Sequence, residues 1–269
     1  MSCNLHATVS VVCQNVLDVE GVTQLHDVVY MVSRFSSKIL SFNATTHQRL
    51  TDIDVKDLRS PWDITACEQT LQLYVADYEE CVWRVSVEGD DIKRFLPKSP
   101  SDTFRPWKLS VTSTRLLVTS HDTKQLIQFD LDGDELRRVQ LPDYMEPYHA
   151  VESPNGAFVV SHRSTPLLQH QVSEVNMDGD VLRQFSSSRV SSPELPLHLA
   201  IDSRGNIFVA DFQNRRILLL DGRLTLRRCI VEERQLNYKP PLRMCYLERT
   251  GQLLAALEKS VAVFDVLCR

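Results

Sequence analysis

Glycine is scarce in this sequence, and long apolar segments are missing. Only 8 of the 269 residues are glycine, about 3% where roughly 7% is usual. No apolar run reaches the roughly 18 residues that a membrane helix needs. The first residues, MSCNLHATVSVV, contain neither a basic n-region nor a long apolar stretch, so they do not resemble a secretory leader. We therefore expect a cytoplasmic protein without a membrane segment.

Cysteine pairs and an excess of positive charge are missing as well. The chain has seven cysteines, an odd number, and none of them forms a CxxC pair. This pattern favours free thiols in a reducing compartment. Lys and Arg total 30 while Asp and Glu total 35, a net charge of −5. That balance argues against a dedicated nucleic-acid binder.

The sequence motifs of common enzyme classes are also absent. The chain contains no HExxH, GxSxG, P-loop or GxGxxG pattern, each of which places catalytic or phosphate-binding groups in a fixed local geometry. We therefore predict a non-enzyme, with no catalytic residue, no metal ligand and no cofactor.

The few glycines lie at turns between short apolar runs. Gly133, Gly179 and Gly222 each follow an aspartate, and Gly156 follows an asparagine. Asp-Gly and Asn-Gly pairs tolerate the positive φ angles of tight hairpins. The runs between them are of strand length and rich in Val, Ile, Leu, Phe and Tyr, without a convincing helical period. This pattern predicts an antiparallel all-β protein.

The apolar runs recur at a nearly constant interval. Equivalent positions are spaced by 44, 43, 41, 50 and 46 residues along the chain, at Tyr30, Tyr74, Leu117, Phe158, Phe208 and Leu254. A repeat of roughly 40–50 residues with four short strands is typical of a propeller blade. We predict a single six-bladed β-propeller over residues 1–269, with blades beginning near 21, 61, 106, 147, 196 and 241. The last blade has room for only three strands, so the strand at 7–13 is expected to complete it.

One segment, residues 197–217, carries a distinct repeat signature. It contains an Asp-x-x-Gly-Asn turn at 202–206, Phe-Val-Ala-Asp at 208–211 and Asn-x-Arg-Ile at 214–217. This segment resembles an NHL repeat, and LYVAD at 73–77 matches it in part. The chain is thus similar to the NHL propellers of TRIM-NHL type proteins, although its other blades keep few of the polar signature residues. Asp77 and Asp211 recur with the repeat, so we interpret them as turn-capping residues.

A polar residue stands two positions after the opening residue of each repeat. These six residues are expected to ring one mouth of the central channel: Thr23, Asp63, Lys108, His149, His198 and Arg243. Apart from Thr23, we interpret these residues as a solvated mouth of the channel. Their polar side chains would pair with one another and bind a partner or ligand. An anion or peptide site is an alternative. A metal site at Asp63, His149 and His198 is another, since imidazole and carboxylate are usual zinc ligands, but Lys108 and Arg243 disfavour metal capture.

Positive charge is concentrated late in the chain. Residues 201–249 contain ten Lys and Arg and six acidic residues. One interpretation is a basic patch for RNA phosphates at Arg215, Arg216, Arg223 and Arg227. We favour a salt-bridged, solvated face, in which Arg223 and Arg227 lie around the outer strand of blade 5, apart from Arg215 and Arg216.

The sequence as a whole favours a non-catalytic propeller that acts as a scaffold for protein interactions. We expect a monomer that binds a protein or peptide partner. One alternative function is an RNA-binding NHL propeller that uses the basic patch. The other is a metal-dependent hydrolase or lyase with its site in the channel.

Overall fold

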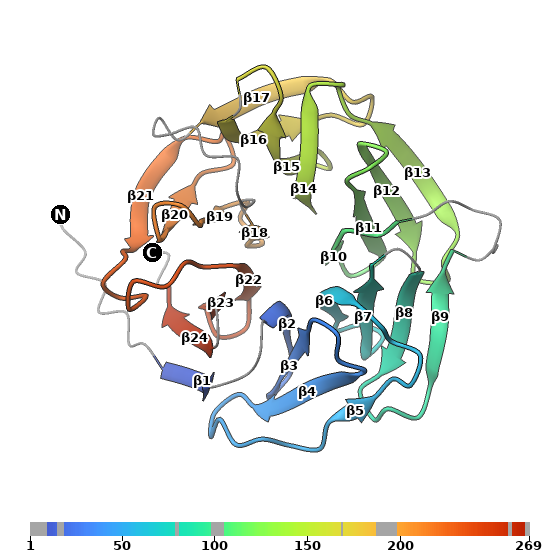
Figure 1. Cartoon of the computed structure of the whole chain (residues 1–269). Helices are drawn as coiled ribbons and strands as arrows, with labels where there is room; N and C mark the ends of the chain where they lie inside the picture. Colours follow the sequence, from blue (N-terminus) through green and yellow to red (C-terminus); the bar gives the residue numbers. More distant parts are fainter. Residues whose placement is uncertain are drawn as a thin grey trace.

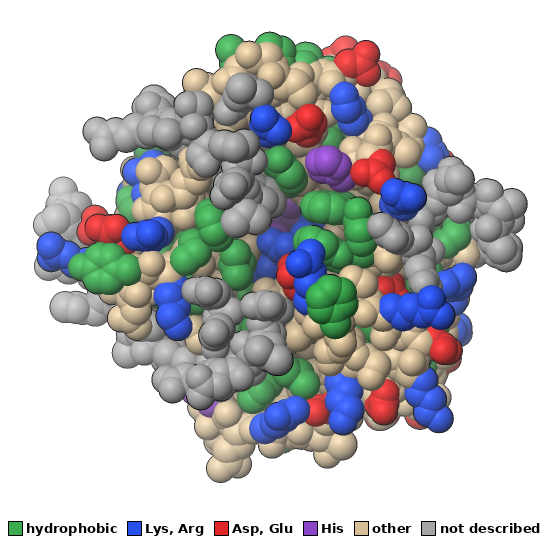
Figure 2. Space-filling view, in the orientation of Figure 1, with side chains coloured by type: hydrophobic (Ala, Val, Ile, Leu, Met, Phe, Trp, Pro, Cys, Tyr) green, Lys and Arg blue, Asp and Glu red, His purple; other side chains and the backbone are tan. Residues whose placement is uncertain are grey.

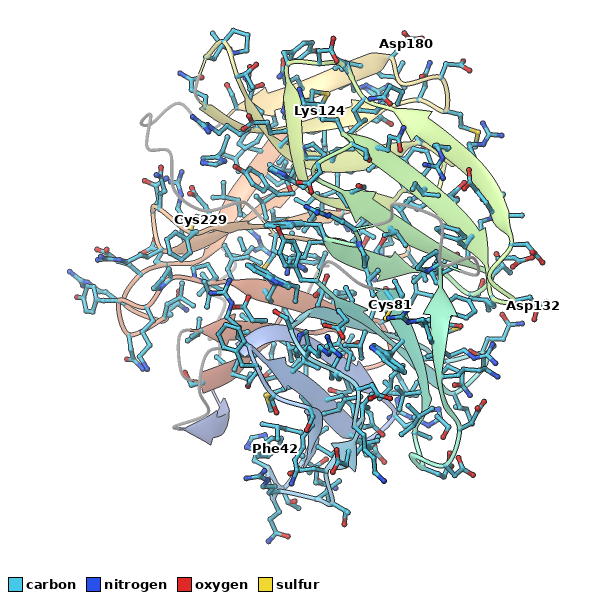
Figure 3. All side chains as sticks on the ribbon, turned by 45° about the vertical axis from the view of Figure 1, so that its right-hand side comes forward. Phe42, Cys81, Lys124, Asp132, Asp180 and Cys229 are labelled. Carbon is cyan, nitrogen blue, oxygen red and sulfur yellow. The ribbon has the colours of Figure 1, made fainter. Side chains whose placement is uncertain are left out.

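The computed structural model describes residues 10–14, 19–78, 81–97, 105–167, 169–186, 198–257 and 260–266. The described chain forms six four-stranded antiparallel sheets, arranged around a common centre as the blades of a propeller (Figure 1). No helix of the described residues is long and apolar enough to cross a membrane. Free thiols are found at the four cysteines whose side chains are described, Cys67, Cys81, Cys229 and Cys245; Figure 3 labels two of them. The predicted all-β, six-bladed fold is confirmed.

Each blade runs from an inner strand at the central channel to an outer strand at the rim. Blade 1 contains, in this order, β2 (Val19–Leu25), β3 (Val28–Ser33), β4 (Lys38–Asn43) and β5 (Ile53–Asp54), and blade 2 contains β6 (Pro61–Cys67), β7 (Gln72–Asp77), β8 (Cys81–Ser86) and β9 (Ile92–Leu96). Blade 3 contains β10 (Lys108–Val111), β11 (Arg115–Ser120), β12 (Gln125–Asp130) and β13 (Glu135–Gln140), and blade 4 contains β14 (Met145–Glu152), β15 (Phe158–Ser164), β16 (Gln169–Val175) and β17 (Val181–Ser186). Blade 5 contains β18 (His198–Ile201), β19 (Ile207–Asp211), β20 (Arg216–Leu220) and β21 (Leu226–Val231), and blade 6 contains β22 (Arg243–Leu247), β23 (Gln252–Leu257), β24 (Ser260–Asp265) and β1 (Ser10–Gln14).

The N-terminal strand closes the last blade, as predicted. β1 pairs antiparallel with β24, with Ser10 opposite Val263 and Gln14 opposite Ser260. The strand extends to Gln14 rather than ending at 13, and residues 7–9 lie outside the described part of the chain. Since β1 covers the edge of β24, the first and last strands share one sheet, which protects that edge from pairing with another molecule.

The innermost strands do not all begin at the predicted prolines. β6 begins at Pro61, but β10 begins at Lys108, two residues after Pro106. Proline has no N–H to donate to a ladder, so it is confined to strand starts and edges or to bulges. In blade 4 the strand begins earlier, at Met145, and a bulge between Pro147 and His149 accommodates the proline.

Tight turns join the third and fourth strands of blades 3 and 4. Gly133 and Gly179 have φ angles of 88° and 92°, values that a residue with a Cβ atom rarely adopts. Figure 3 shows Asp132 and Asp180, which flank these glycines, at the outer edge of the molecule. In blade 5 the Asp221-Gly222 pair behaves differently, because Leu224 adopts the left-handed conformation with φ 58° and Gly222 does not.

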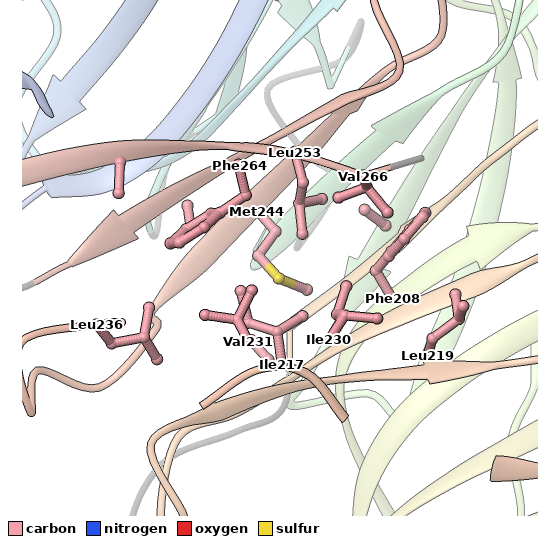
Figure 4. Close-up of a cluster of buried hydrophobic side chains, with 14 of the residues drawn as sticks. Phe208, Ile217, Leu219, Ile230, Val231, Leu236, Met244, Leu253, Phe264 and Val266 are labelled. Carbon is pink, nitrogen blue, oxygen red and sulfur yellow. The ribbon is translucent and has the colours of Figure 1, made fainter. Parts of the chain in front are cut away.

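The hydrophobic core is divided among the interfaces between blades. Alternate side chains of a strand point to opposite faces of its sheet, so each blade packs against both of its neighbours. Six buried clusters result, one for each pair of adjacent blades. Figure 4 shows the cluster between blades 5 and 6, in which Phe208 and Ile217 face Met244, Leu253 and Phe264. Every blade therefore depends on both neighbours for burial of its apolar surface.

The two recurring aspartates have different structural roles. Asp211 accepts hydrogen bonds from the Asn214 amide group, at 2.8 Å, and from Arg216 Nε, also at 2.8 Å, so it stabilises its own hairpin as predicted. Asp77 instead accepts from the backbone N–H of Ser60, at 2.7 Å, and from Trp83 Nε1. Within the described residues, which leave out 79 and 80 of the adjoining turn, Asp77 anchors the chain entering blade 2.

Candidate functional site

The five predicted channel residues occupy equivalent places in their blades. Each pairs with the residue at the same position of the second strand, as in Asp63 opposite Ala76 and His198 opposite Ala210. The same holds for Lys108, His149 and Arg243. All five are buried, with exposures between 1% for Lys108 and 8% for Arg243. The predicted solvated mouth is therefore wrong: the ring is an internal layer of the channel.

The sixth member of the ring is Gly21 and not Thr23. Gly21 lies opposite Val32, the equivalent of Ala76 in blade 2, and a bulge separates it from Val19, as one separates Asp63 from Pro61. The repeat pattern placed Gly21 at the proline position and so shifted the ring by two residues. Blade 1 thus contributes no side chain to the ring. Thr23 lies elsewhere in the channel wall, with its hydroxyl 3.9 Å from Cys245 Sγ.

Three ring residues converge inside the channel. Asp63, His149 and His198 each offer a polar side-chain atom, and these atoms lie within 4.8 Å of one another. The two imidazole rings are stacked, with centroids 3.9 Å apart and planes inclined by 14°. Asp63 Oδ2 accepts a hydrogen bond from Leu109 N at 2.9 Å. Side chains from blades 2, 4 and 5 therefore form one buried cluster.

Backbone donors determine the tautomers of both histidines. Leu199 N donates to His149 Nδ1 and Met244 N donates to His198 Nδ1, both at 3.2 Å. Because each Nδ1 is an acceptor, the proton of the neutral ring is on Nε2. His149 Nε2–H donates to Leu109 O at 3.3 Å. His198 Nε2 is buried and has no hydrogen-bond partner within the described residues.

Burial keeps both imidazoles neutral. It lowers the pKa of His149 to about 3, and the positive charges of Lys108 and Arg243 act in the same direction. The pKa of His198 is well below its ordinary value, because of burial and then of His149 beside it. Burial raises the pKa of Asp63, although Lys108 and Arg243 oppose that shift. Burial also lowers the pKa of Lys108 to about 7.

The two cations of the ring are directed away from this cluster. Lys108 Nζ donates to the carbonyl oxygen of Trp62. Arg243 donates to Glu20 O at 2.7 Å and to Leu242 O at 2.9 Å. Trp62 and Glu20 directly precede the ring residues of the neighbouring blades, Asp63 and Gly21. The side chains of Lys108 and Arg243 therefore extend toward the face at which the inner strands begin. Arg243 is also paired with the Glu20 carboxylate at 3.4 Å. Acceptors of the protein thus hold both cations away from the cluster, which does not favour the alternative of an anion site there.

A cavity of about 180 Å³ lies on the other side of the ring. Its wall includes Asp63, His149 and His198, and it continues along the inner strands to Thr112, Glu152 and other residues near their ends. Lys108 and Arg243 do not line it. The cavity therefore extends from the histidine pair toward the face at which the inner strands end.

Aromatic side chains surround the opposite mouth, where the inner strands begin. Trp62 and Trp107, each one residue before a ring residue, are stacked with centroids 4.9 Å apart. His121 lies 5.0 Å from Trp107 and 5.7 Å from Tyr148. Figure 2 shows hydrophobic and histidine side chains gathered around the central hollow of one face. Sequence reasoning missed this layer, although the recurring proline–aromatic pairs at 61–62, 106–107 and 147–148 were a signal for it.

The cluster does not fit a metal ion. Metal coordination by neutral histidine requires a free lone pair on a ring nitrogen. In His149 and His198 the Nδ1 lone pair accepts a backbone N–H bond, and Nε2 carries the proton. A metal would have to displace a buried backbone bond or a ring proton. Nearby positive charge from Lys108 and Arg243 opposes capture further.

The basic patch of the RNA-binding alternative does not form one surface. Arg215 and Arg216 lie at the start of β20, whereas Arg223 follows its end, in the turn before β21. Arg216 is paired with Asp211 at 2.8 Å and Arg227 with Asp221 at 2.7 Å. This arrangement separates the four cations and neutralises two of them, so it does not favour an RNA interface.

Comparison with known proteins supports the fold through structure and not through sequence. No protein-family model matches the chain, and no curated protein matches it in sequence. A catalytically inactive virginiamycin B lyase from Staphylococcus aureus, with quinupristin, superposes with a TM-score of 0.67 at 12% identity, covering 93% of this chain and 80% of that one. A streptogramin B lyase gives 0.65 at 10% identity, covering 96% and 97%. Kuenenia stuttgartiensis hydrazine synthase gives 0.64 at 11% identity, covering both chains completely.

The protein is thus a six-bladed β-propeller, and the resemblance to NHL repeats is supported at the level of the fold only. The similar propellers include lyases, which contradicts our prediction of a non-catalytic interaction scaffold. The prediction of a non-enzyme is unsupported for the same reason. Of the two alternatives, the metal-dependent hydrolase or lyase with its site in the channel agrees better with these neighbours than the RNA-binding propeller does, although the cluster does not fit the metal of that alternative.

Proposed function

We propose that the protein is an enzyme with its active site in the central channel, and that it catalyses a lyase-type elimination. One observation carries the proposal. Polar atoms of Asp63, His149 and His198 meet within 4.8 Å at the inner end of a cavity, shielded from solvent. Buried titratable groups that converge in a pocket are typical of catalytic sites. The similarity to solved lyase propellers supports this class of reaction.

Asp63 is the proposed general base. An effective base has a pKa nearer to the working pH than a free aspartate has, and burial raises the pKa of Asp63. Its bond to Leu109 N holds the carboxylate in place.

His198 is the proposed hydrogen-bond donor to the reacting carbonyl group. A neutral imidazole can stabilise a developing oxyanion through N–H, provided that its other nitrogen accepts a bond that fixes the tautomer. Met244 N supplies that bond at 3.2 Å. His149 is a positioning residue, because its stacked ring holds His198 in place.

The proposed elimination consumes no water molecule. Asp63 removes a proton from the carbon next to the carbonyl group, and His198 Nε2–H stabilises the negative charge on the carbonyl oxygen. The electron pair of the broken C–H bond then forms a carbon–carbon double bond as the bond to the leaving group breaks. The leaving group departs with the electron pair of the bond that breaks and takes up the proton held by Asp63.

Untargeted substrate profiling tests this proposal. The wild-type protein is incubated with a fractionated small-molecule extract, and mass spectrometry follows which compounds are consumed and formed. Asp63→Asn is the test variant. Glu174→Gln is the matched control, because Glu174 is 2% exposed and bonded to Asn155 and Arg183 outside the cavity.

We expect a substrate–product pair that depends on wild-type protein or Glu174→Gln and slows about 100-fold or more with Asp63→Asn. Incubation in ¹⁸O-labelled water should leave the products unlabelled. Labelled products would indicate hydrolysis and refute the lyase assignment. Absence of any pair that depends on Asp63 would refute the enzyme.

A further inference from the structure

Lys108 is the most deeply buried charged residue of the ring, and the proposed reaction does not use it. Its side chain is 1% exposed, and its ammonium group donates to a single carbonyl oxygen, that of Trp62. Lys108 does not line the cavity, so a substrate in the cavity would not contact it. Burial of an ammonium group is costly unless an opposite charge compensates for the lost hydration. The structure around Lys108 shows which charge does so.

Two hydrogen bonds cross from blade 2 to blade 3 and fix Lys108 relative to Asp63. Lys108 Nζ donates to the oxygen of Trp62, the residue directly before Asp63. In the opposite direction, the backbone N–H of Leu109, the residue directly after Lys108, donates to Asp63 Oδ2 at 2.9 Å. Each side chain is thus bound to the backbone next to the other residue. The ammonium group and the carboxylate therefore keep a fixed relative position inside the channel.

The other charges around this pair are compensated elsewhere. Six further titratable or charged side chains face the pair, from blades 1, 4, 5 and 6: Glu20, Arg34, His149, His198, Arg243 and Cys245. Burial keeps both imidazoles and the thiol neutral, because it lowers the pKa of the imidazoles and raises the pKa of the thiol. Arg243 and Arg34 share the carboxylate of Glu20, at 3.4 and 3.9 Å. Among the described residues, Asp63 and Lys108 are the two charges of this region outside an ion pair.

The charge of Lys108 opposes the effect of burial on Asp63. A carboxyl group that is 3% exposed has lost most of its hydration, which favours the protonated form. Protonated Asp63 could not accept a proton from a substrate. A positive charge favours the carboxylate, and the attraction is strong where little water lies between the charges. Burial accordingly raises the pKa of Asp63, and among the charges that lower it again Lys108 has the largest effect.

We infer that Lys108 is a positioning residue of the proposed active site, whose ammonium charge keeps Asp63 in the carboxylate form that a general base requires. This inference rests on the proposed function and adds a residue that acts without touching the substrate. No ion pair joins the two side chains directly within the described residues, so the attraction acts through space. The coupling is reciprocal, because each charge changes the proton affinity of the other group by the same factor.

An NMR titration of the full-length protein measures the proton affinity of Asp63 without a substrate. Aspartate side chains are labelled with ¹³C at the carboxyl carbon, and the Asp63 resonance is identified by its absence in Asp63→Asn. Lys108→Met is the test variant, since methionine is unbranched and fills a similar space without the charge. Lys93→Met is the matched control, because Lys93 is an exposed lysine on the outer strand of blade 2.

We expect the proton affinity of Asp63 to rise about tenfold or more in Lys108→Met. In Lys93→Met it should stay within about twofold of the wild-type value, because solvent screens an exposed charge. An unchanged or lower proton affinity of Asp63 in Lys108→Met would overturn the inference. So would an equal rise in both variants, since it would reflect the net charge of the protein alone.

The wild-type protein provides a second test, which decides if Lys108→Met does not fold. Burial lowers the pKa of Lys108 to about 7. The Asp63 resonance should therefore show a second, smaller inflection near that pH, where Lys108 loses its proton. Lys108→Arg keeps its charge at all accessible pH values, so this inflection should disappear while the proton affinity of Asp63 is retained. A wild-type curve without the second inflection would show that the two groups are not coupled.

Failure of this inference can be told apart from failure of the proposed function. Tighter proton binding by Asp63 in Lys108→Met, without any turnover that depends on Asp63, would support the role of Lys108 and refute the enzyme. Turnover that depends on Asp63, together with an unchanged proton affinity of Asp63 in Lys108→Met, would support the enzyme and refute the role of Lys108.

Discussion

Replacing Gly21 with alanine is expected to destabilise the propeller at the contact between blades 1 and 2. A Cβ atom built on Gly21 lies 2.7 Å from Ile64 N and 3.0 Å from the Cα and carbonyl carbon of Asp63. These are backbone atoms, so neither a rotamer change nor a small side-chain shift relieves the overlap. The substitution also displaces the segment that carries the Asp63 carboxylate.

The expected loss of stability in Gly21→Ala is the difference between two opposing effects. Overpacking in a close-packed interior costs roughly 1–3 kcal/mol. Alanine in a strand is otherwise favoured over glycine by about 0.5–1 kcal/mol. We expect a net loss of about 1–2 kcal/mol in the free energy of unfolding, measured by urea titration with tryptophan fluorescence.

Gly222→Ala is the matched control for this substitution. Gly222 also lacks a left-handed backbone, and its added Cβ would lie 3.4 Å from the closest atom, Gly205 O. We expect the control to be neutral or slightly stabilising. If Gly21→Ala were as stable as Gly222→Ala, the close approach of blades 1 and 2 would be disproved.

Three further predictions follow from the same contacts. Deleting residues 1–14 removes β1 and exposes the edge of β24, so the melting temperature should fall and the protein should aggregate; unchanged melting would refute the closure. His149→Ala leaves Leu199 N and Leu109 O unpaired and should cost roughly 2–5 kcal/mol in a urea titration, whereas a histidine at a solvated mouth would be replaced at little cost in stability. In the unfolded chain His149 takes up a proton below its ordinary pKa of about 6.5. In the folded protein, where its pKa is about 3, it stays neutral over the same range. The folded state should therefore lose stability as pH falls from about 6.5 toward 3. The loss of unfolding free energy between pH 7 and pH 5 should be smaller in His149→Gln than in the wild-type protein. The raised pKa of Asp63 has the opposite effect on stability, but it is present in both proteins and cancels in the comparison. Parallel stability–pH profiles of the two proteins would show that His149 is not a buried neutral base.

The sequence by itself determined the architecture of this protein. Short apolar runs between turn residues specify strands, because alternation and turn chemistry act over a few residues. Their regular spacing implied a ring of six blades, and the missing fourth strand of the last blade implied closure by the N-terminal strand. The inward position of Asp63, Lys108, His149, His198 and Arg243 also followed from the repeat, because equivalent residues of repeated units occupy equivalent places.

Only the tertiary structure determined what those five residues do. Strand pairing placed Gly21 in the ring and Thr23 outside it, because Val19, and not Gly21, corresponds to the opening proline Pro61. The direction of Lys108 and Arg243 depends on carbonyl oxygens of Trp62 and Glu20 in other blades. The tautomers of His149 and His198 likewise depend on N–H groups about 50 and 46 residues away. Burial, hydrogen-bond partners and pKa values arise from contacts between blades, and no local sequence pattern encodes these contacts, because they form only when the ring closes.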